Sequence, residues 1–370
     1  MISRSKMNDT KKRQLNIPWK LIFNIAVISL TLFLVGFFVF SEGGFIDLVK
    51  SISSGDMDFS PVWIVMAVFV HFLNIALDAT IIHLFIRENT PGVKPKVAFI
   101  TSMVGQFFCA VTPSATGGQP MQILSMSRMG VKPSNGTSAL IQKFLVWQFT
   151  LTIYCIISVS FGFSFIMDKL DPTMWTLTII GFSAQVVMIV VLMLASFCKG
   201  LTIKVVDSLF KLLGKLHILK NVEEKINNIN DSLTSFHENN KQLNNNKHLV
   251  IKVYVITIVQ MTAYFLVPFC IARAFNINCN IFEMLFAQSY VSMVSSLMPL
   301  PGGSGAAEYS FSVFFGAYFT AETMKTAILL WRTITYYGTI AVTMPFAQLH
   351  KKEPALPENA DTANDVKNKE

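Results

Sequence analysis

Residues 111–122 constrain the fold of this chain more than any other stretch. They read V-T-P-S-A-T-G-G-Q-P-M-Q and lie between two strongly apolar runs. A regular helix cannot continue through Pro113, Gly117, Gly118 and Pro120, so the backbone must open at this point. A second stretch of the same kind, L-M-P-L-P-G-G-S-G-A-A-E, covers residues 297–308. Each half of the chain therefore contains one break that interrupts an apolar segment.

The composition places these breaks in an integral membrane protein. The chain is 52% hydrophobic and only 14% charged, whereas soluble domains carry about 25% charged residues. The net charge of +8 does not indicate nucleic acid, because the basic residues lie in short loops between apolar runs and set the topology there. The five cysteines form no C-x-x-C pair, so we expect no disulfide framework, metal site or cofactor.

The apolar runs predict an all-α polytopic fold. We expect a basic cytoplasmic N-terminus over 1–18, a membrane domain over 19–350 and a disordered cytoplasmic tail over 351–370. Residues 199–248 contain eight lysines and apolar residues at helical spacing, which predicts a cytoplasmic amphipathic insertion. The expected full membrane spans, about six, are 21–40, 62–86, 139–167, 174–198, 249–272 and 324–349.

The two interrupted segments, 97–126 and 281–319, are predicted to be re-entrant hairpins. Neither half of the first has the twenty or so apolar residues needed to cross alone. The distribution of lysine and arginine places both termini in the cytoplasm and makes the hairpins enter from opposite sides. Oppositely oriented broken helices are typical of inverted-repeat transporters. The alternative for 97–126 is one kinked crossing, which would place Arg128 outside.

The breaks are candidates for binding a lipid headgroup. A helix restarting after glycines presents free N–H groups and the positive end of its dipole, which together suit an anion such as phosphate. The alternative is that the glycines only allow helices to pack closely. The candidate headgroup-binding residues at the two breaks are Thr112, Thr116, Gly117, Gly118, Gln119, Gln122, Gly302, Gly303 and Ser304.

Charged residues within apolar segments are candidates for lining a cavity. Asp78, Glu308 and Arg332 each lie in apolar sequence, where exposure to lipid is costly. Arg332 could hold a phosphate bidentately, and either acid could face a cationic headgroup or take up a proton. A buried pair of acid and arginine that fixes helix register is the alternative. Lys143 lies near a span end, where its amine could also reach the membrane interface, and Tyr336 fits interface anchoring or packing.

With both breaks read, the chain resembles the membrane domain of the bacterial lysylphosphatidylglycerol synthase/flippase family, the multiple peptide resistance factors. The resemblance covers roughly residues 17–350. It is carried by T-P-S-A-T-G-G-Q-P at 112–120, P-L-P-G-G-S-G-A-A-E at 299–308 and Arg332. It implies a multi-pass protein of the bacterial cytoplasmic membrane that moves aminoacylated phosphatidylglycerol between leaflets and thereby lowers the attraction of cationic peptides.

We therefore expect a lipid translocator whose partner is a phospholipid with an anionic or aminoacylated headgroup. Two alternatives stay open. The family's synthase is a phosphatidylglycerol lysyltransferase, but only about twenty polar residues follow the last span, so the soluble catalytic domain is expected to be absent. The chain could instead be a non-transporting subunit that docks an envelope enzyme or a separate synthase through 199–248. A homo-oligomer is also compatible with the sequence.

Overall fold

The computed structural model describes residues 59–167, 172–215, 222–296 and 300–348, together with a few isolated positions. All secondary structure within these ranges is helical, which agrees with the predicted all-α class. The predicted first span (21–40), the N-terminal flank (1–18) and the C-terminal tail (351–370) lie outside the described ranges.

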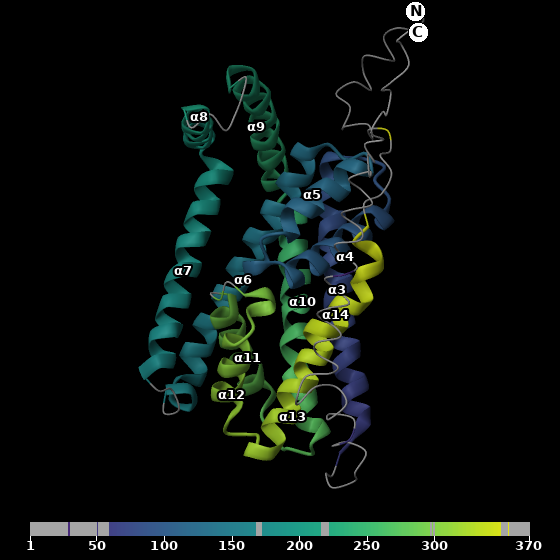
Figure 1. Ribbon diagram of the computed structural model, residues 1–370, viewed down its shortest axis with the longest axis vertical. Helices are drawn as coiled ribbons and strands as arrows, with labels where there is room; N and C mark the ends of the chain where they lie inside the picture. The colour runs from purple at the N-terminus through teal and green to yellow at the C-terminus, as the bar shows by residue number, and fades with distance from the viewer. Residues whose placement is uncertain are drawn as a thin grey trace, which may run out of the picture.

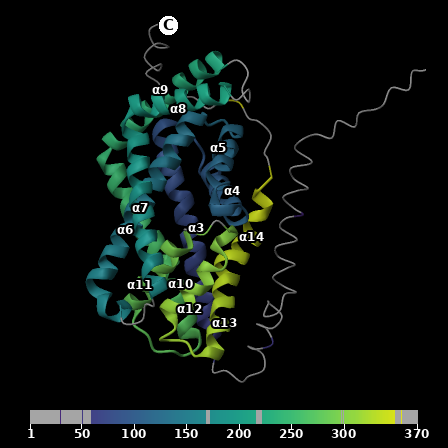
Figure 2. The ribbon, with the colours of Figure 1, turned by 60° about the vertical axis from the view of Figure 1, so that its left-hand side comes forward.

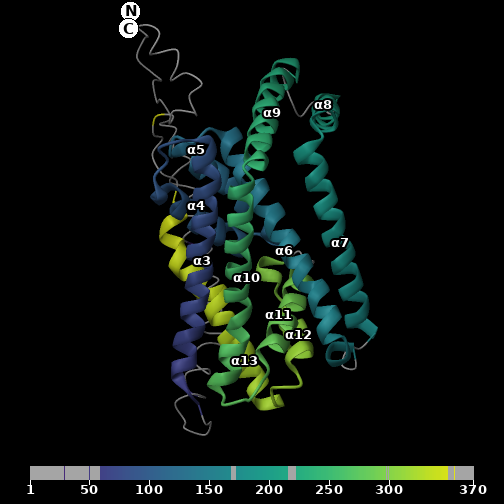
Figure 3. The same cartoon turned by 180° about the vertical axis from the view of Figure 1, so that it is seen from behind.

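Long apolar helices form the frame of the bundle. In the described part of the chain, four helical stretches are long and apolar enough to cross a membrane. Their helices begin at or near the predicted spans, and α3 starts with a proline at a first-turn position, where its missing N–H costs nothing. Helices α3 and α10 pack side by side along their length (Figures 1 and 3). The four helices are α3 (Pro61–Asn89), α6 (Pro133–Met167), α7 (Pro172–Phe197) and α10 (Lys247–Ala274).

Both interrupted segments form helical hairpins. In the first, α4 (Pro95–Val111) and α5 (Gly118–Arg128) pack against each other around the short turn η1 (Pro113–Ala115). In the second, α11 (Ile281–Ser296) and α12 (Ala306–Phe315) pack around η2 (Pro301–Gly303). The first hairpin lies in the upper half of the bundle and the second in the lower half (Figure 1). Because η1 and η2 contact each other, the two turns meet between the halves.

The two turns repeat the same local structure. Pro113 is followed by Ser114 and Ala115 with φ of 50° and 54°, and Pro301 is followed by two glycines with φ of 62° and 63°. The next residue, Thr116 or Ser304, donates its hydroxyl back to the proline carbonyl at 2.9 Å or 2.8 Å. The repeated unit is therefore Pro-x-x-Ser/Thr-Gly. Ser114 and Ala115, rather than Gly117 and Gly118, correspond to Gly302 and Gly303.

The last apolar segment, residues 321–346, packs against both hairpins and is divided into short helices and turns. It consists of α13 (Ala321–Arg332), the π-helical turn η3 (Thr333–Tyr337), α14 (Gly338–Thr343) and the 3-10 turn η4 (Met344–Phe346). Helix α13 packs against α12, and α14 packs against α4. Single π-turns inside helices are often found at functional sites. Here the π-turn begins directly after Arg332.

The polar segment after α7 folds into two helices, α8 (Lys199–Lys215) and α9 (Val222–Asn245), which cover one end of the bundle (Figure 2). Helix α9 is joined to α6 through buried polar contacts. Ser138 Oγ donates to the Phe236 carbonyl at 3.1 Å, and Gln142 Nε2 donates to Asn240 Oδ1 at 3.1 Å. Leu243, which is itself part of α9, is fully buried. The C-terminal part of α9 is thus an integral part of the bundle.

We expect Leu243→Ala to destabilise the protein by about 2 to 4 kcal/mol, because it removes a fully buried side chain and leaves a cavity. The matched control is Lys241→Ala on the same helix, where the side chain is exposed; its effect should stay within about 0.5 kcal/mol. Thermal unfolding in detergent, followed by circular dichroism, measures both. Equal effects of the two substitutions would show that α9 is only loosely attached.

Candidate functional site

Arg332 holds the tip of the second hairpin. Its Nε lies 2.7 Å from Glu308 Oε1, and its Nη1 donates to the Gly302 carbonyl at 2.9 Å. The guanidinium lies over the rings of Trp331 and Tyr336, with its carbon 4.9 Å and 5.5 Å from their centroids. The residue is only 6% exposed, and within the described part of the chain neither its Nε, which lies in the ion pair with Glu308, nor its Nη2 makes a hydrogen bond; Nη2 is also outside the ion pair. One donor of a buried cation is therefore available at the junction of the hairpins.

Tyr336 connects this arginine to the first hairpin. Its hydroxyl donates to the carbonyl of Ala110 near the end of α4, at 3.2 Å. Its ring lies so close to Gly302 that a Cβ there would be 2.3 Å from the Tyr336 ring. Together with its positive φ, this contact requires glycine at position 302. Tyr336 therefore fastens both hairpin tips to the last segment.

The two helices that restart after the turns begin differently. At the start of α12, Glu308 Oε2 accepts a hydrogen bond from the Gly305 N–H at 2.6 Å, so this helix carries its own carboxylate. At the start of α5, the Gly117 N–H donates to Thr112 Oγ1 at 2.9 Å, and its first turn contains no acidic residue. Of the two predicted anion sites, only the α5 start retains a positive helix end without an internal carboxylate.

The predicted polar residues of the first break point in different directions. Thr116 and Gln119 are exposed beside the turn. The Thr112 hydroxyl donates a hydrogen bond to the Phe108 carbonyl at 2.5 Å, so its proton is engaged within the first hairpin. Gln122 is buried and donates to the Thr101 carbonyl at 3.2 Å, so it joins α5 to α4. At the second break, Gly303 is buried and Ser304 closes the turn.

Gly118 permits the close approach of α5 to α4. A Cβ at this position would lie 2.1 Å from Cys109 Sγ and 3.2 Å from the Gly105 carbonyl. The packing interpretation of this glycine therefore has direct geometric support. Any test of its part in ligand binding must first remove the steric clash.

We expect Gly118→Ala to destabilise the protein by roughly 1 to 3 kcal/mol through overpacking, and Cys109→Ala to restore most of that loss. The clash involves Cys109 Sγ, while the cysteine Cβ would lie at an ordinary 3.5 Å. Melting temperatures of the single and double variants test this. If Cys109→Ala gives no rescue, Gly118 is required for a reason other than its contact with that sulfur.

A second charged cluster lies where α3, α4, α6 and α10 meet. Asp78, which is 3% exposed, lies 2.5 Å from Lys143 Nζ through Oδ1. Its Oδ2 accepts a hydrogen bond from Ser102 Oγ at 2.6 Å, and Gln260 Nε2 approaches Oδ1 at 3.4 Å. Asp78 and Lys143 thus compensate each other, and Glu308 and Arg332 form the other pair.

The sequence singled out the four charged residues and offered an acid–arginine pair as one alternative. Glu308 and Arg332 form such a pair, whereas the pairing of Asp78 with Lys143 was not predicted. Sequence reasoning also missed Ser102, Gln260 and the role of Tyr336. Ser102 and Gln260 are ordinary polar residues in apolar helices, and only the approach of α4 and α10 to Asp78 distinguishes them. Tyr336 lies in the middle of the predicted span 324–349 and belongs to no special sequence pattern. The signal that could have found it is its spacing of four residues from Arg332, which is one helical turn.

The long apolar helices and the polar junction between two broken hairpins define a polytopic α-helical membrane protein. The family model described as "Lysylphosphatidylglycerol synthase TM region" matches residues 21–343, and the chain belongs to this family. It is also similar to a UPF0104 membrane protein of Archaeoglobus fulgidus, with 25% identity over 250 residues, which is 65% of this chain and 71% of that protein. The resemblance noted from the sequence is confirmed, and membership supports a role connected with membrane lipids.

Proposed function

We propose that this protein translocates a phospholipid between the two leaflets of the membrane, with the headgroup passing the junction of η1 and η2. The observation that carries the proposal is the meeting of two hairpin turns from opposite halves of the bundle beside a buried arginine. Non-helical backbone of this kind belongs beside a cavity or within protein. Opposed half-helices around a central site are the arrangement used for alternating access.

In this proposal the lipid phosphate binds between the start of α5 and Arg332. The α5 start offers backbone N–H groups and the positive dipole end, and Arg332 offers the donor Nη2, which is otherwise unused in the described chain. Because Nη1 and Nε are engaged with Gly302 and Glu308, binding a phosphate would weaken the contacts that hold η2. Headgroup binding and opening of the tip junction are thereby coupled.

In this proposal the ion pair between Glu308 and Arg332 forms again after the lipid leaves, which completes the cycle. Its carboxylate is already 2.7 Å from Nε, and a phosphate and a carboxylate compete for the same planar donor group. Asp78 and Lys143 are proposed to line the path on the side of the first hairpin. An aminoacylated phosphatidylglycerol, the lipid suggested by the family, would bring both an anionic phosphate and a cationic amine to these charges.

Reconstitution into vesicles tests the function. Fluorescent phospholipids with phosphatidylglycerol, lysylphosphatidylglycerol and phosphatidylcholine headgroups are incorporated, and a membrane-impermeant quencher reports the fraction in the outer leaflet over time. We expect faster exchange than in protein-free vesicles for at least one anionic or aminoacylated lipid. Rates equal to those of empty vesicles for every headgroup would contradict the proposal.

A further inference from the structure

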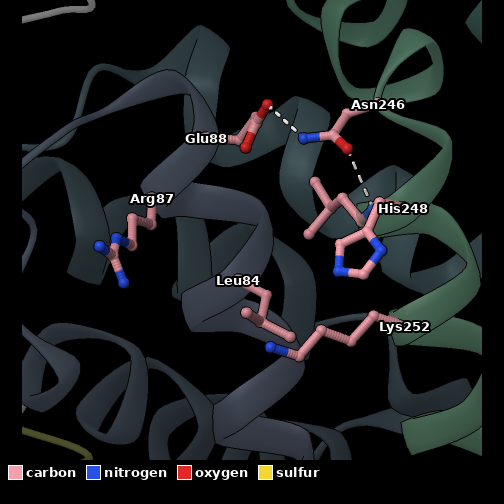
Figure 4. Close-up of a pocket in the computed structure, with 7 residues that line it drawn as sticks. Leu84, Arg87, Glu88, Asn246, His248 and Lys252 are labelled. Carbon is pink, nitrogen blue, oxygen red and sulfur yellow. Dashed lines mark hydrogen bonds between the residues drawn. The ribbon is translucent and has the colours of Figure 1, made fainter.

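A pocket of about 440 Å³ lies at the end of the bundle where α3 ends and α10 begins. It is separate from the hairpin junction. Arg87 and Glu88 come from the last turn of α3, whereas His248 and Lys252 come from the start of α10 (Figure 4). Its complete lining is Leu84, Arg87, Glu88, Asn246, His248, Leu249 and Lys252.

The acid of this pocket is already engaged by a neighbour. Asn246 Nδ2 donates to Glu88 Oε1 at 2.8 Å, and Asn246 Oδ1 accepts from the Leu249 N–H at 3.1 Å as the N-cap of α10. Glu88 turns toward Asn246, while Lys252 extends from α10 toward Leu84 (Figure 4). The pocket lining therefore contains two permanent cations, Arg87 and Lys252, and one engaged carboxylate. In Figure 4 the Arg87 side chain extends away from Glu88, and the Lys252 amine lies near Leu84. The positive end of α10 and the negative end of α3 both lie at this pocket and offset each other, so the positive excess comes from the side chains.

The pocket continues into an apolar surface on α10. Leu84 and the buried Leu249 form its wall. Beyond them, Ile251, Val255 and Ile258 are 64%, 56% and 47% exposed. Their spacing of four and three residues places them on one face of the helix. A ligand that fits both parts has an anionic head and apolar chains.

We propose that this pocket binds the phosphate group of an anionic membrane lipid. His248 and Lys252 hold the phosphate from α10, the exposed Arg87 side chain turns toward it from the end of α3, and the acyl chains lie along Ile251, Val255 and Ile258. Basic pockets between helices at the membrane surface have the chemistry that holds such headgroups. The site does not depend on lipid translocation, since it shares no residue with the hairpin junction.

Native mass spectrometry of the full chain in detergent, titrated with phosphatidylglycerol, tests the proposal. The test variant is Arg87→Gln/Lys252→Gln. The matched control is Lys94→Gln/Lys96→Gln, which removes the same charge from exposed positions at the same end of the bundle, outside the pocket. Each pocket cation should contribute roughly five-fold to affinity, so the test variant should bind about 25-fold more weakly. The control should bind as the wild type does.

The outcomes separate the ligand sources. Equal weakening in both variants would overturn the pocket in favour of general surface attraction, and unchanged binding in the test variant would overturn it outright. Equal affinity for phosphatidylcholine would refute selection of an anionic lipid. If inorganic phosphate at millimolar concentration displaces the lipid from the wild type and itself binds with the same dependence on Arg87 and Lys252, the natural ligand is a soluble phosphate, and the lipid assignment fails. Unchanged melting temperature of the lipid-free variants confirms that both are folded.

Discussion

Replacing Arg332 with glutamine is expected to reduce lipid translocation by about 100-fold. Without the guanidinium, the phosphate at the translocation barrier loses a charged, buried hydrogen-bond donor, which costs on the order of 3 kcal/mol and corresponds to a rate change of that size. The substitution removes the bond to the Gly302 carbonyl and leaves Glu308 without its cation. The measurement is the rate of fluorescent lipid exchange in vesicles, with melting temperature recorded in parallel.

The double variant Glu308→Gln/Arg332→Gln separates two roles of the arginine. If Arg332 only compensates Glu308, neutralising both residues should restore stability and transport together, since the unpaired charge is gone. Our proposal predicts recovered stability with transport still lost, because the phosphate donor is absent. Arg332→Lys adds a second comparison: it keeps the charge but not the planar pair of donors. Full transport by either the double variant or Arg332→Lys would contradict direct phosphate binding.

A large loss of stability is expected from Asp78→Asn. This substitution leaves the Lys143 amine without its carboxylate in a site that is largely enclosed, at a cost of about 3 kcal/mol. Asp78→Asn/Lys143→Gln should be closer to the wild type than either single variant, because the remaining amides can hydrogen-bond to each other and to Ser102. Thermal unfolding of the four proteins forms a double-mutant cycle.

A coupling energy near zero in that cycle would contradict the ion pair. Transport in the same proteins gives independent information. If the pair serves only to fix helix register, the stable double variant should translocate lipid at a normal rate. If the charges line the path, the double variant should be folded but slow.

The outline of the fold could be predicted because proline and glycine mark breaks that no apolar helix tolerates. The four long helices and both hairpins follow from apolar run lengths and from the breaks at 111–122 and 297–308. The correspondence between the two breaks is loose in the sequence. Both breaks contain a Gly-Gly pair, Gly117-Gly118 and Gly302-Gly303, but it is Ser114 and Ala115 that occupy the left-handed positions equivalent to Gly302 and Gly303. Non-glycine residues rarely adopt that conformation, so their sequence gives no signal of it.

The candidate site was predictable in its charges and unpredictable in its contacts. Asp78, Glu308 and Arg332 stand out because ionised groups are costly in apolar helices. Their pairing depends on which helices become neighbours. Lys143, which could have reached the interface, instead meets Asp78. Tyr336 looks like an ordinary interface aromatic, but the packing of α14 on α4 places its hydroxyl against Ala110.

The most direct test of the central claim is photochemical labelling by a phospholipid with a photoreactive headgroup, in vesicles where the protein is translocating lipid. Mass spectrometry then identifies the labelled peptides. We predict labelling of the two tips, residues 112–122 and 300–308, which disappears when unlabelled lipid of the transported headgroup is added in excess. Labelling confined to the outer surfaces of α7 and α10, with both tips unmodified during active transport, would show that the headgroup does not pass between the hairpins.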